Sequence, residues 1–387
     1  MKERYNSKAF LLIFLGTLTA FGPLVTDMYL PTLPEMTGYF STSSSMVQLG
    51  LTASMIGLAA GQLLFGPASD RYGRRPPLIT AMILFLLSTL GCILARDIFQ
   101  FVAWRLVQGV AGAGSIVISR SVAADKYRGQ DLAKMLAVIG AINGVAPVAA
   151  PMIGGMVSGS WGWKGIFWIL MGLGTILLAG SIHFSESLPA AQRVKGSWKN
   201  VFRSAGSLFR NKVYVWCVLQ FAFAQAVLFA NISSAPFIMQ EHFGFTPMMF
   251  SIYFGINAVA IVVAAAASVR FRTPDRALRC GSIGMVAASV LLCTAMALGC
   301  GFWTYEILLI ALLASLGLTF TASNTLAMDA GHDNAGTASA LLGALGFAAG
   351  GIVSPLVGLG NIMSTTGIIF AAGSVCSYVC TRRAASA

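Results

Sequence analysis

The feature that most constrains this chain is a series of long apolar runs separated by short polar segments. A helix of about 20 residues rises about 30 Å, which matches the hydrocarbon core of a bilayer. In hydrocarbon each backbone polar group must be satisfied within its own segment, so these runs are expected to be helices. Charged residues make up only 10% of the 387 positions, whereas soluble domains carry about a quarter. The sequence therefore predicts an all-α membrane protein.

We predict twelve membrane-spanning helices, over residues 9–30, 46–67, 78–95, 98–119, 133–156, 164–183, 213–237, 247–268, 278–299, 305–328, 336–358 and 361–380. Basic residues test this series, because cytoplasmic loops of membrane proteins are enriched in Lys and Arg. If the N-terminus is cytosolic, 22 of the 25 Lys and Arg lie on the cytosolic side of the membrane. The exceptions are Arg96 and Lys164, which lie on the external side, and Arg105, which lies within a span. A missing helix would reverse this bias in every later loop. We therefore expect both termini in the cytosol.

The net charge of +12 follows from this topology and does not require a nucleic-acid partner. We expect the basic loops to contact anionic lipid headgroups. The seven cysteines are odd in number and lack paired spacing, which indicates neither a disulfide framework nor a zinc site. No cofactor or metal is expected, and we expect a monomer.

A basic polar segment divides the predicted spans into two sets of six. Part of it, residues 198–209, has an amphipathic pattern that predicts a surface helix. Related patterns recur in the two halves, which indicates two pseudo-symmetric bundles around a central cavity. The predicted organisation is an N-terminal bundle over 1–184, a linker over 185–212 and a C-terminal bundle over 213–387.

Two ionisable residues are predicted to be buried within spans, Asp27 and Arg105. Charged groups in a membrane are costly, so a functional role is the default hypothesis for both. At 1.5 Å per residue Asp27 lies about 27 Å from the inner end of its span, and Arg105 about 10 Å below the outer end of its own. Both therefore fall in the outer half of the membrane. Asp27 is either a proton-binding carboxylate or a residue near the outer water interface. Arg105 either joins an inward-facing polar network with Gln108, or it forms a fixed salt bridge or snorkels toward the lipid headgroups.

The fifth predicted span contains an unusual series of glycines and prolines: Gly144, Pro147, Pro151, Gly154 and Gly155. Proline removes a backbone donor and glycine permits close helix approach, so we predict a kinked and tightly packed helix. One interpretation is packing alone, and the other is a bending point that limits leakage through the cavity.

Other polar and aromatic residues in spans are weaker candidates for contact with a substrate. They are Tyr29, Phe223, Asn231, Tyr253 and Asn257, each of which could instead bridge helices or face lipid.

The turn between the second and third predicted spans, Gly66 to Pro77, resembles the loop 2–3 signature of the major facilitator superfamily. Arg105-Leu106-Val107-Gln108-Gly109 resembles the span-four motif of its proton-coupled members, and Gly144 to Gly155 resembles the span-five antiporter motif of its exporters. Asp27 to Pro34 is similar to the first-span signature of the Bcr/CflA-type drug exporters, the bicyclomycin and chloramphenicol efflux group.

The resemblance implies roles for these residues. Asp27 and Arg105 would carry proton coupling, with Gln108 orienting them. A gate between the two halves would be formed on the cytosolic side by Asp70, Arg71, Gly73, Arg74 and Arg75, with Asp70 near the N-terminus of the eleventh span.

We therefore expect a proton-coupled exporter of small amphipathic drugs in the inner membrane, working by alternating access and driven by the proton gradient. An exporter of an endogenous metabolite such as an amino acid, a sugar or a siderophore is the alternative. A multispanning membrane enzyme is disfavoured because the three histidines are scattered, and a passive channel because buried charges and kinked helices suit a gated carrier.

Overall fold

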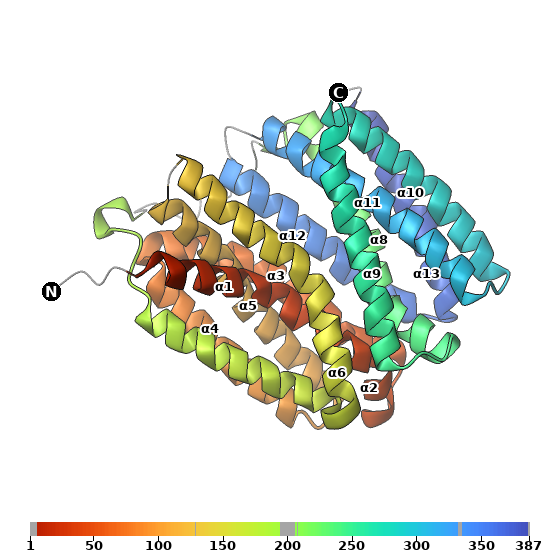
Figure 1. The fold of residues 1–387 in the computed structure, drawn as a ribbon, viewed down its shortest axis with the longest axis horizontal. Coiled ribbons are helices and arrows are strands. Elements are labelled where there is room, and N and C mark those ends of the chain that lie inside the picture. Colours follow the sequence, from red (N-terminus) through yellow and green to blue (C-terminus); the bar gives the residue numbers. More distant parts are fainter. Residues whose placement is uncertain (1–5, 128, 194–205, 207, 332–334, 386–387) are drawn as a thin grey trace. The chain divides into compact units, whose positions relative to one another are not determined.

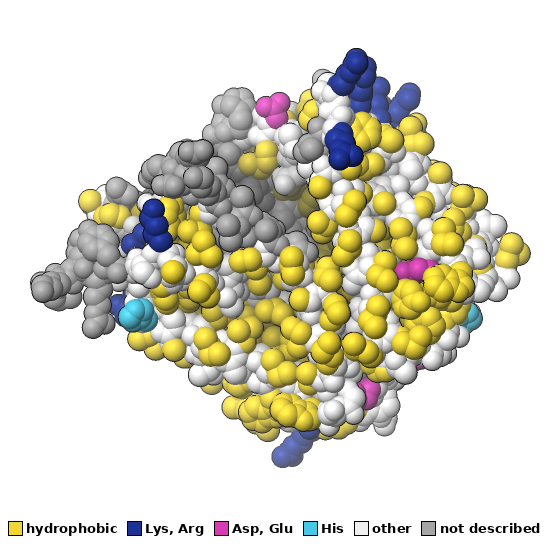
Figure 2. All heavy atoms as spheres, in the orientation of Figure 1, with side chains coloured by type: hydrophobic (Ala, Val, Ile, Leu, Met, Phe, Trp, Pro, Cys, Tyr) yellow, Lys and Arg dark blue, Asp and Glu magenta, His cyan; other side chains and the backbone are white. Residues whose placement is uncertain are grey.

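The computed structural model describes residues 6–127, 129–193, 206, 208–331 and 335–385, and the secondary structure of these residues is helical (Figure 1). Within the described residues, eleven segments are long and apolar enough to cross a membrane. Hydrophobic side chains predominate on the face drawn in Figure 2, and the visible Lys and Arg lie toward its margins. The structure is therefore that of a multi-pass helical membrane protein.

Contacts divide the chain into two compact units. Unit 1 comprises Met1–Thr42 and Ala53–Gly196, and unit 2 comprises Ser43–Thr52 and Ser197–Ala387. The first turns of α3 (Ser44–Tyr72) therefore group with unit 2, which boundaries drawn along the sequence did not anticipate. The amphipathic helix expected over 198–209 lies mostly outside the described residues.

Unit 1 contains α1 (Lys8–Asp27), η1 (Leu30–Thr32), α2 (Leu33–Tyr39), most of α3, α4 (Arg75–Leu94), α5 (Ile98–Lys126), α6 (Gly129–His183) and η2 (Ala190–Gln192). Helix α1 packs against α5 and α6, and α4 packs against the same two helices. A Cβ atom at Gly57, Gly61 or Gly109 would collide with the backbone of the facing helix, so glycine permits α3 and α5 to approach closely.

Helix α6 is 55 residues long, which would be about 82 Å if it were straight. Its backbone leaves the helical region at Gly162, where φ is 59° and ψ is −168°. In Figure 1 the ribbon of α6 turns back on itself. A positive φ is readily adopted only by glycine, so Gly162 separates two helical segments. The fifth and sixth predicted spans fall one in each segment, although the total of twelve spans stays a prediction.

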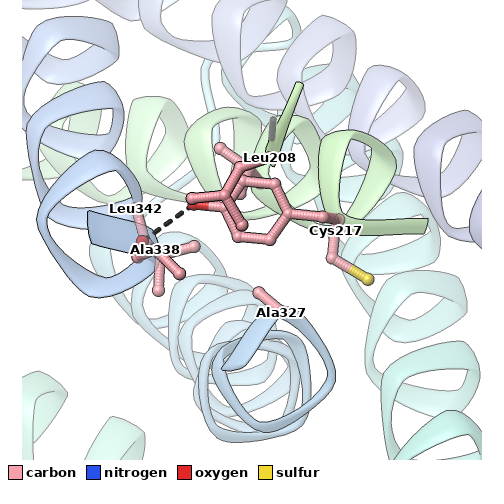
Figure 3. Close-up of a cluster of buried hydrophobic side chains, with 7 residues drawn as sticks. Leu208, Cys217, Ala327, Ala338 and Leu342 are labelled. Atoms are coloured by element: carbon pink, nitrogen blue, oxygen red, sulfur yellow. Dashed lines mark hydrogen bonds between the residues drawn. The ribbon is translucent and has the colours of Figure 1, made fainter. Parts of the chain in front are cut away.

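Unit 2 contains α8 (Lys212–Phe237), η3 (Ile238–His242), α9 (Pro247–Ala267), η4 (Ser268–Arg270), α10 (Pro274–Ala297), α11 (Phe302–Ala330), α12 (Ala335–Val353), η6 (Ser354–Gly358) and α13 (Ile362–Ala384). Part of its core joins α8, α11 and α12 through Cys217, Ala327 and Leu342 (Figure 3). The Tyr214 hydroxyl donates a hydrogen bond of 2.8 Å to the Ala338 carbonyl, which satisfies its polar end in this apolar setting (Figure 3).

Candidate functional site

The centre of unit 1 holds a fully buried arginine, Arg105 of α5. Its Nη1 donates a 2.5 Å hydrogen bond to Gln108 Oε1, and its Nη2 donates to the Val25 carbonyl at 3.2 Å and to the Ser54 hydroxyl at 3.1 Å. Gln108 in turn donates to Thr89 Oγ1 at 2.7 Å. One guanidinium thus links α5 to α1 and α3, and reaches α4 through Gln108.

Aromatic rings cover the same guanidinium. The Arg105 Cζ lies 4.4 Å from the centroid of the Tyr29 ring and 5.8 Å from that of Phe167. Contacts of this kind are stronger when the cation is desolvated, and Arg105 is. Tyr29 is fully buried, and within the described part of the chain its hydroxyl has no hydrogen-bond partner.

Asp27 is the last residue of α1 and is 6% exposed. The helix ends there, three residues before the predicted end of the first span, because Met28 caps it and η1 follows. Asp27 is within electrostatic reach of Arg105, but the two side chains form no ion pair. Neutral acceptors occupy the two terminal nitrogens of Arg105, whereas its Nε has no partner among the described residues.

The glycine-rich part of α6 packs against the chain just beyond Asp27. A Cβ atom at Gly154 would collide with the carbonyl oxygen of Met28. Pro151 and Gly155 are buried as well, and Pro147 is half-buried, while the surroundings of Gly144 fall outside the described side chains. This series therefore sets how closely α6 approaches the end of α1.

A second polar site of unit 1, which we call the Arg74 cluster, comprises Ser69, Asp70, Arg74, Asp125 and Glu186. The Arg74 guanidinium pairs with Asp70 at 2.5 Å and with Asp125 at 2.8 Å, and it also donates to the Ser69 hydroxyl at 2.9 Å. Burial alone would lower the pKa of Arg74, but the hydrogen bonds and charges of Asp125 and Asp70 outweigh burial and raise it. Arg74 is therefore a permanent cation.

Backbone groups of the same turn bind Glu186, which follows α6. Its carboxylate accepts hydrogen bonds from the N–H groups of Arg74 at 2.8 Å and Arg75 at 3.1 Å. Gly73 has a φ of 92°, and a Cβ there would crowd the Glu186 carboxylate. Asp125 and Glu186 were not among the residues that the sequence singled out, because they lie far from the turn along the chain. Arg71 lies over the Tyr72 ring at 5.5 Å and is exposed.

The candidates of unit 2 lie on two helices. Phe223 and Asn231 belong to α8, and Tyr253 and Asn257 to α9. Both asparagines are 2% exposed, while Phe223 and Tyr253 are half-buried. The interpretation that Asp27 and Arg105 are the ionisable residues buried in spans was incomplete, because Glu306 near the start of α11 is 2% exposed. An acidic residue in an apolar run was the signal that could have found it.

Helices of this length and composition, with buried ionisable side chains between them, define an integral membrane protein of the kind that moves solutes or ions. Residues 13–355 match the model of the Major Facilitator Superfamily, and the chain belongs to that superfamily.

Relatives and solved structures agree with this assignment. The chain is 38% identical over 374 residues to an uncharacterized MFS-type transporter, YdgK, of Bacillus subtilis, with 93% of each chain covered. It is 28% identical over 381 residues to a bicyclomycin resistance protein homolog of Haemophilus influenzae, covering 97% of this chain and 95% of the relative. The xylose transporter XylE of E. coli, in a partially occluded inward open conformation, has the same fold, with a TM-score of 0.77, 16% identity and 96% of each chain covered. The resemblance to drug exporters of this superfamily is thus confirmed, and these relatives are named as transporters or resistance proteins.

Proposed function

We propose that this protein exports small amphipathic compounds across the inner membrane in exchange for protons. One observation carries the proposal: a buried carboxylate, Asp27, lies within electrostatic reach of a buried guanidinium, and one N–H group of that guanidinium has no partner among the described residues. Relatives named for drug resistance support export of drugs as the purpose of this arrangement. Twelve spans, both termini in the cytosol and a monomeric carrier driven by the proton gradient without a cofactor complete the proposal.

The chemistry assigns a separate task to each residue. Arg105 is held in place by neutral acceptors on three helices, while Asp27 gains or loses a proton. Without its proton, Asp27 is attracted to the Nε–H group of Arg105, and α1 is drawn toward α5. With a proton, that attraction is lost and α1 is released. Gln108 is a positioning residue, because its two hydrogen bonds orient the guanidinium.

Gly154 connects this motion to α6. The Met28 carbonyl rests where a larger residue would place its Cβ, so a movement at the end of α1 is transmitted directly to α6. In an alternating-access cycle this contact couples the protonation state of Asp27 to the packing of the first and fifth spans.

The test is drug-driven proton movement in everted membrane vesicles, followed with a fluorescent probe of the pH gradient. Vesicles with the wild-type protein lose part of their gradient when chloramphenicol or bicyclomycin is added, and vesicles with Asp27→Asn do not. Asp27→Glu retains the carboxylate and restores part of the response. An unchanged response in Asp27→Asn would show that the proton site is elsewhere.

The substrate class is tested by susceptibility of an efflux-deficient host to chloramphenicol, bicyclomycin and sulfonamides, with and without a protonophore. Resistance that the protonophore abolishes supports drug export. No change for any of these compounds would instead favour export of an endogenous metabolite by the same fold.

A further inference from the structure

Glu306 is a buried acid of unit 2 that plays no part in the Asp27 and Arg105 site. It lies one turn into α11 and is 2% exposed. Within the described part of the chain, neither of its carboxylate oxygens makes a hydrogen bond of ordinary length. A buried carboxylate without a short hydrogen bond or a counter-charge is strongly unfavourable. The group therefore requires either a proton or a bound cation.

The residue beside Glu306 is left unsatisfied in the same way. The Asn257 carboxamide of α9 lies next to the Glu306 carboxylate, and it is also 2% exposed. Neither its oxygen nor its nitrogen makes a hydrogen bond of ordinary length with the described residues. The fully buried Tyr305 also has a hydroxyl without a partner there. Most buried polar groups are satisfied, so a cluster of such atoms indicates a ligand site.

Aromatic rings flank this polar pair. Tyr253 precedes Asn257 by one helical turn on α9, and Phe302 precedes Glu306 by one turn on α11, so each pair shares a helix face. The rings of Tyr253 and Phe302 meet at 4.7 Å between centroids with an interplanar angle of 72°. Two facing pairs, one aromatic and one polar, therefore lie side by side along the two helices. Both rings are half-buried, so the aromatic pair forms the exposed end of this site.

Among the described residues, no other charged group neutralises Glu306. The sequences of α9 and α12 contain no charged residue. The basic residues of α10 lie near its start, and the last of them, Arg279, is about 27 Å along the helix from the turn into α11. Lys212 is likewise at the far end of α8, and Arg270 follows the last turn of α9. The remaining ionisable groups at this end are the exposed Glu241 and His242 of η3, the Tyr253 and Tyr305 phenols and the Cys293 and Cys300 thiols.

We propose that Glu306, Asn257, Tyr253 and Phe302 form a binding site for an organic ammonium group, which competes at Glu306 with a proton. The carboxylate supplies the counter-charge and aromatic faces stabilise a desolvated cation. Two or three oxygen ligands are too few for calcium or magnesium, which take six or more. Binding is an exchange in which the cation enters, the carboxyl O–H bond breaks and the proton leaves, so the net charge of the site is unchanged. This inference rests on the proposed export function. It specifies that cationic amphiphiles are among the exported compounds.

The experiment measures binding of ethidium, a fluorescent quaternary cation, to the purified full-length protein at pH 6 and pH 8. Binding by the wild type is weaker at pH 6, because protons compete for the carboxylate. Glu306→Gln weakens ethidium binding by about tenfold at pH 8 and abolishes the difference between the two pH values. Glu306→Asp retains the pH dependence, and Asn257→Ala weakens binding without removing it. Glu241→Gln, which removes an exposed acid at the same end of unit 2, leaves binding unchanged.

Chloramphenicol, which is neutral, serves as the control ligand for the effect of charge. A monodisperse elution profile shows that each variant is folded. Loss of ethidium binding that exceeds the loss of chloramphenicol binding supports the site. Ethidium binding that is absent in the wild type, independent of pH, or equally reduced in Glu241→Gln would overturn it. Asp27→Asn separates the two proposals, because it should stop drug-driven proton movement while leaving the pH dependence of ethidium binding intact. If instead wild-type vesicles show no drug-driven proton movement, the export proposal fails, regardless of how the Glu306 variants bind ethidium.

Discussion

Arg74→Ala removes the residue on which the Arg74 cluster depends. The side chain of Arg74 is 7% exposed, that of Asp125 is 14% exposed, and Asp70 is half-exposed at 49%. Removing one partner of a buried ion pair costs about 3 to 5 kcal/mol, because the other charge remains buried. Exposed pairs contribute only about 0 to 1 kcal/mol, so Asp70 adds little. Allowing for the partial exposure of Asp125, we expect a loss of about 3 kcal/mol, arising mainly at Asp125.

The measurement is the temperature at which the purified protein loses its monodisperse elution peak in detergent. For a unit of this size a loss of about 3 kcal/mol lowers the unfolding temperature by roughly 6 to 12 °C. Arg71→Ala is the matched control, because Arg71 belongs to the same turn, carries the same charge and has no ion pair among the described residues. That variant should change stability by less than about 0.5 kcal/mol.

Equal losses in Arg74→Ala and Arg71→Ala would refute this reasoning, since only the number of positive charges would then matter. A double variant of Arg74→Ala with Asp125→Asn provides a further check. If the two residues act on each other directly, its loss is smaller than the sum of the single losses.

Two further predictions concern the Arg105 site. Gly154→Ala places a methyl group against the Met28 carbonyl, so it should lower the free energy of unfolding by about 1 to 3 kcal/mol and reduce transport. Gly159 has open space around it, so Gly159→Ala should change neither thermal unfolding nor export. A Gly154→Ala variant that transports and unfolds like the wild type would contradict the close contact. Gln108→Leu removes the acceptor of the Arg105 hydrogen bond and the donor to Thr89. We expect this variant to lose about 1 to 3 kcal/mol of stability and to show reduced drug-driven proton movement. Thr89→Val should have a smaller effect on both. The reverse order of the two variants would show that Gln108 does not orient the arginine.

Local chemistry explains why much of this site could be predicted from the sequence. A charge within an apolar run stands out at any position, and Arg105 with Gln108 three residues later must share a helix face. The loop signature and the glycines of α6 were equally visible, because each belongs to one continuous segment. Glu306 was missed because it lies at the edge of a predicted span, where a water-exposed acid is ordinary.

The partners of these residues come from distant segments, and no local rule selects them. Ser54 and Thr89 are hydroxyl residues in apolar helices, indistinguishable in sequence from others that bond only to their own helix. Asp125 and Glu186 resemble ordinary acids at helix ends until the fold brings them to Arg74.

The apolar runs alone are enough to predict a helical chain that crosses the membrane many times and carries charge inside it, because the energetic cost of burying polar groups in lipid acts on each segment separately. Which groups lie next to those charged residues depends on the tertiary structure. It left Asp27 and Arg105 close but without an ion pair between them, and it paired Arg74 with Asp125. It placed Glu306 beside Asn257, without a counter-charge among the described residues. Those outcomes depend on how closely helices approach, and positions such as Gly109 and Gly154 set that distance only once the facing backbone is in place.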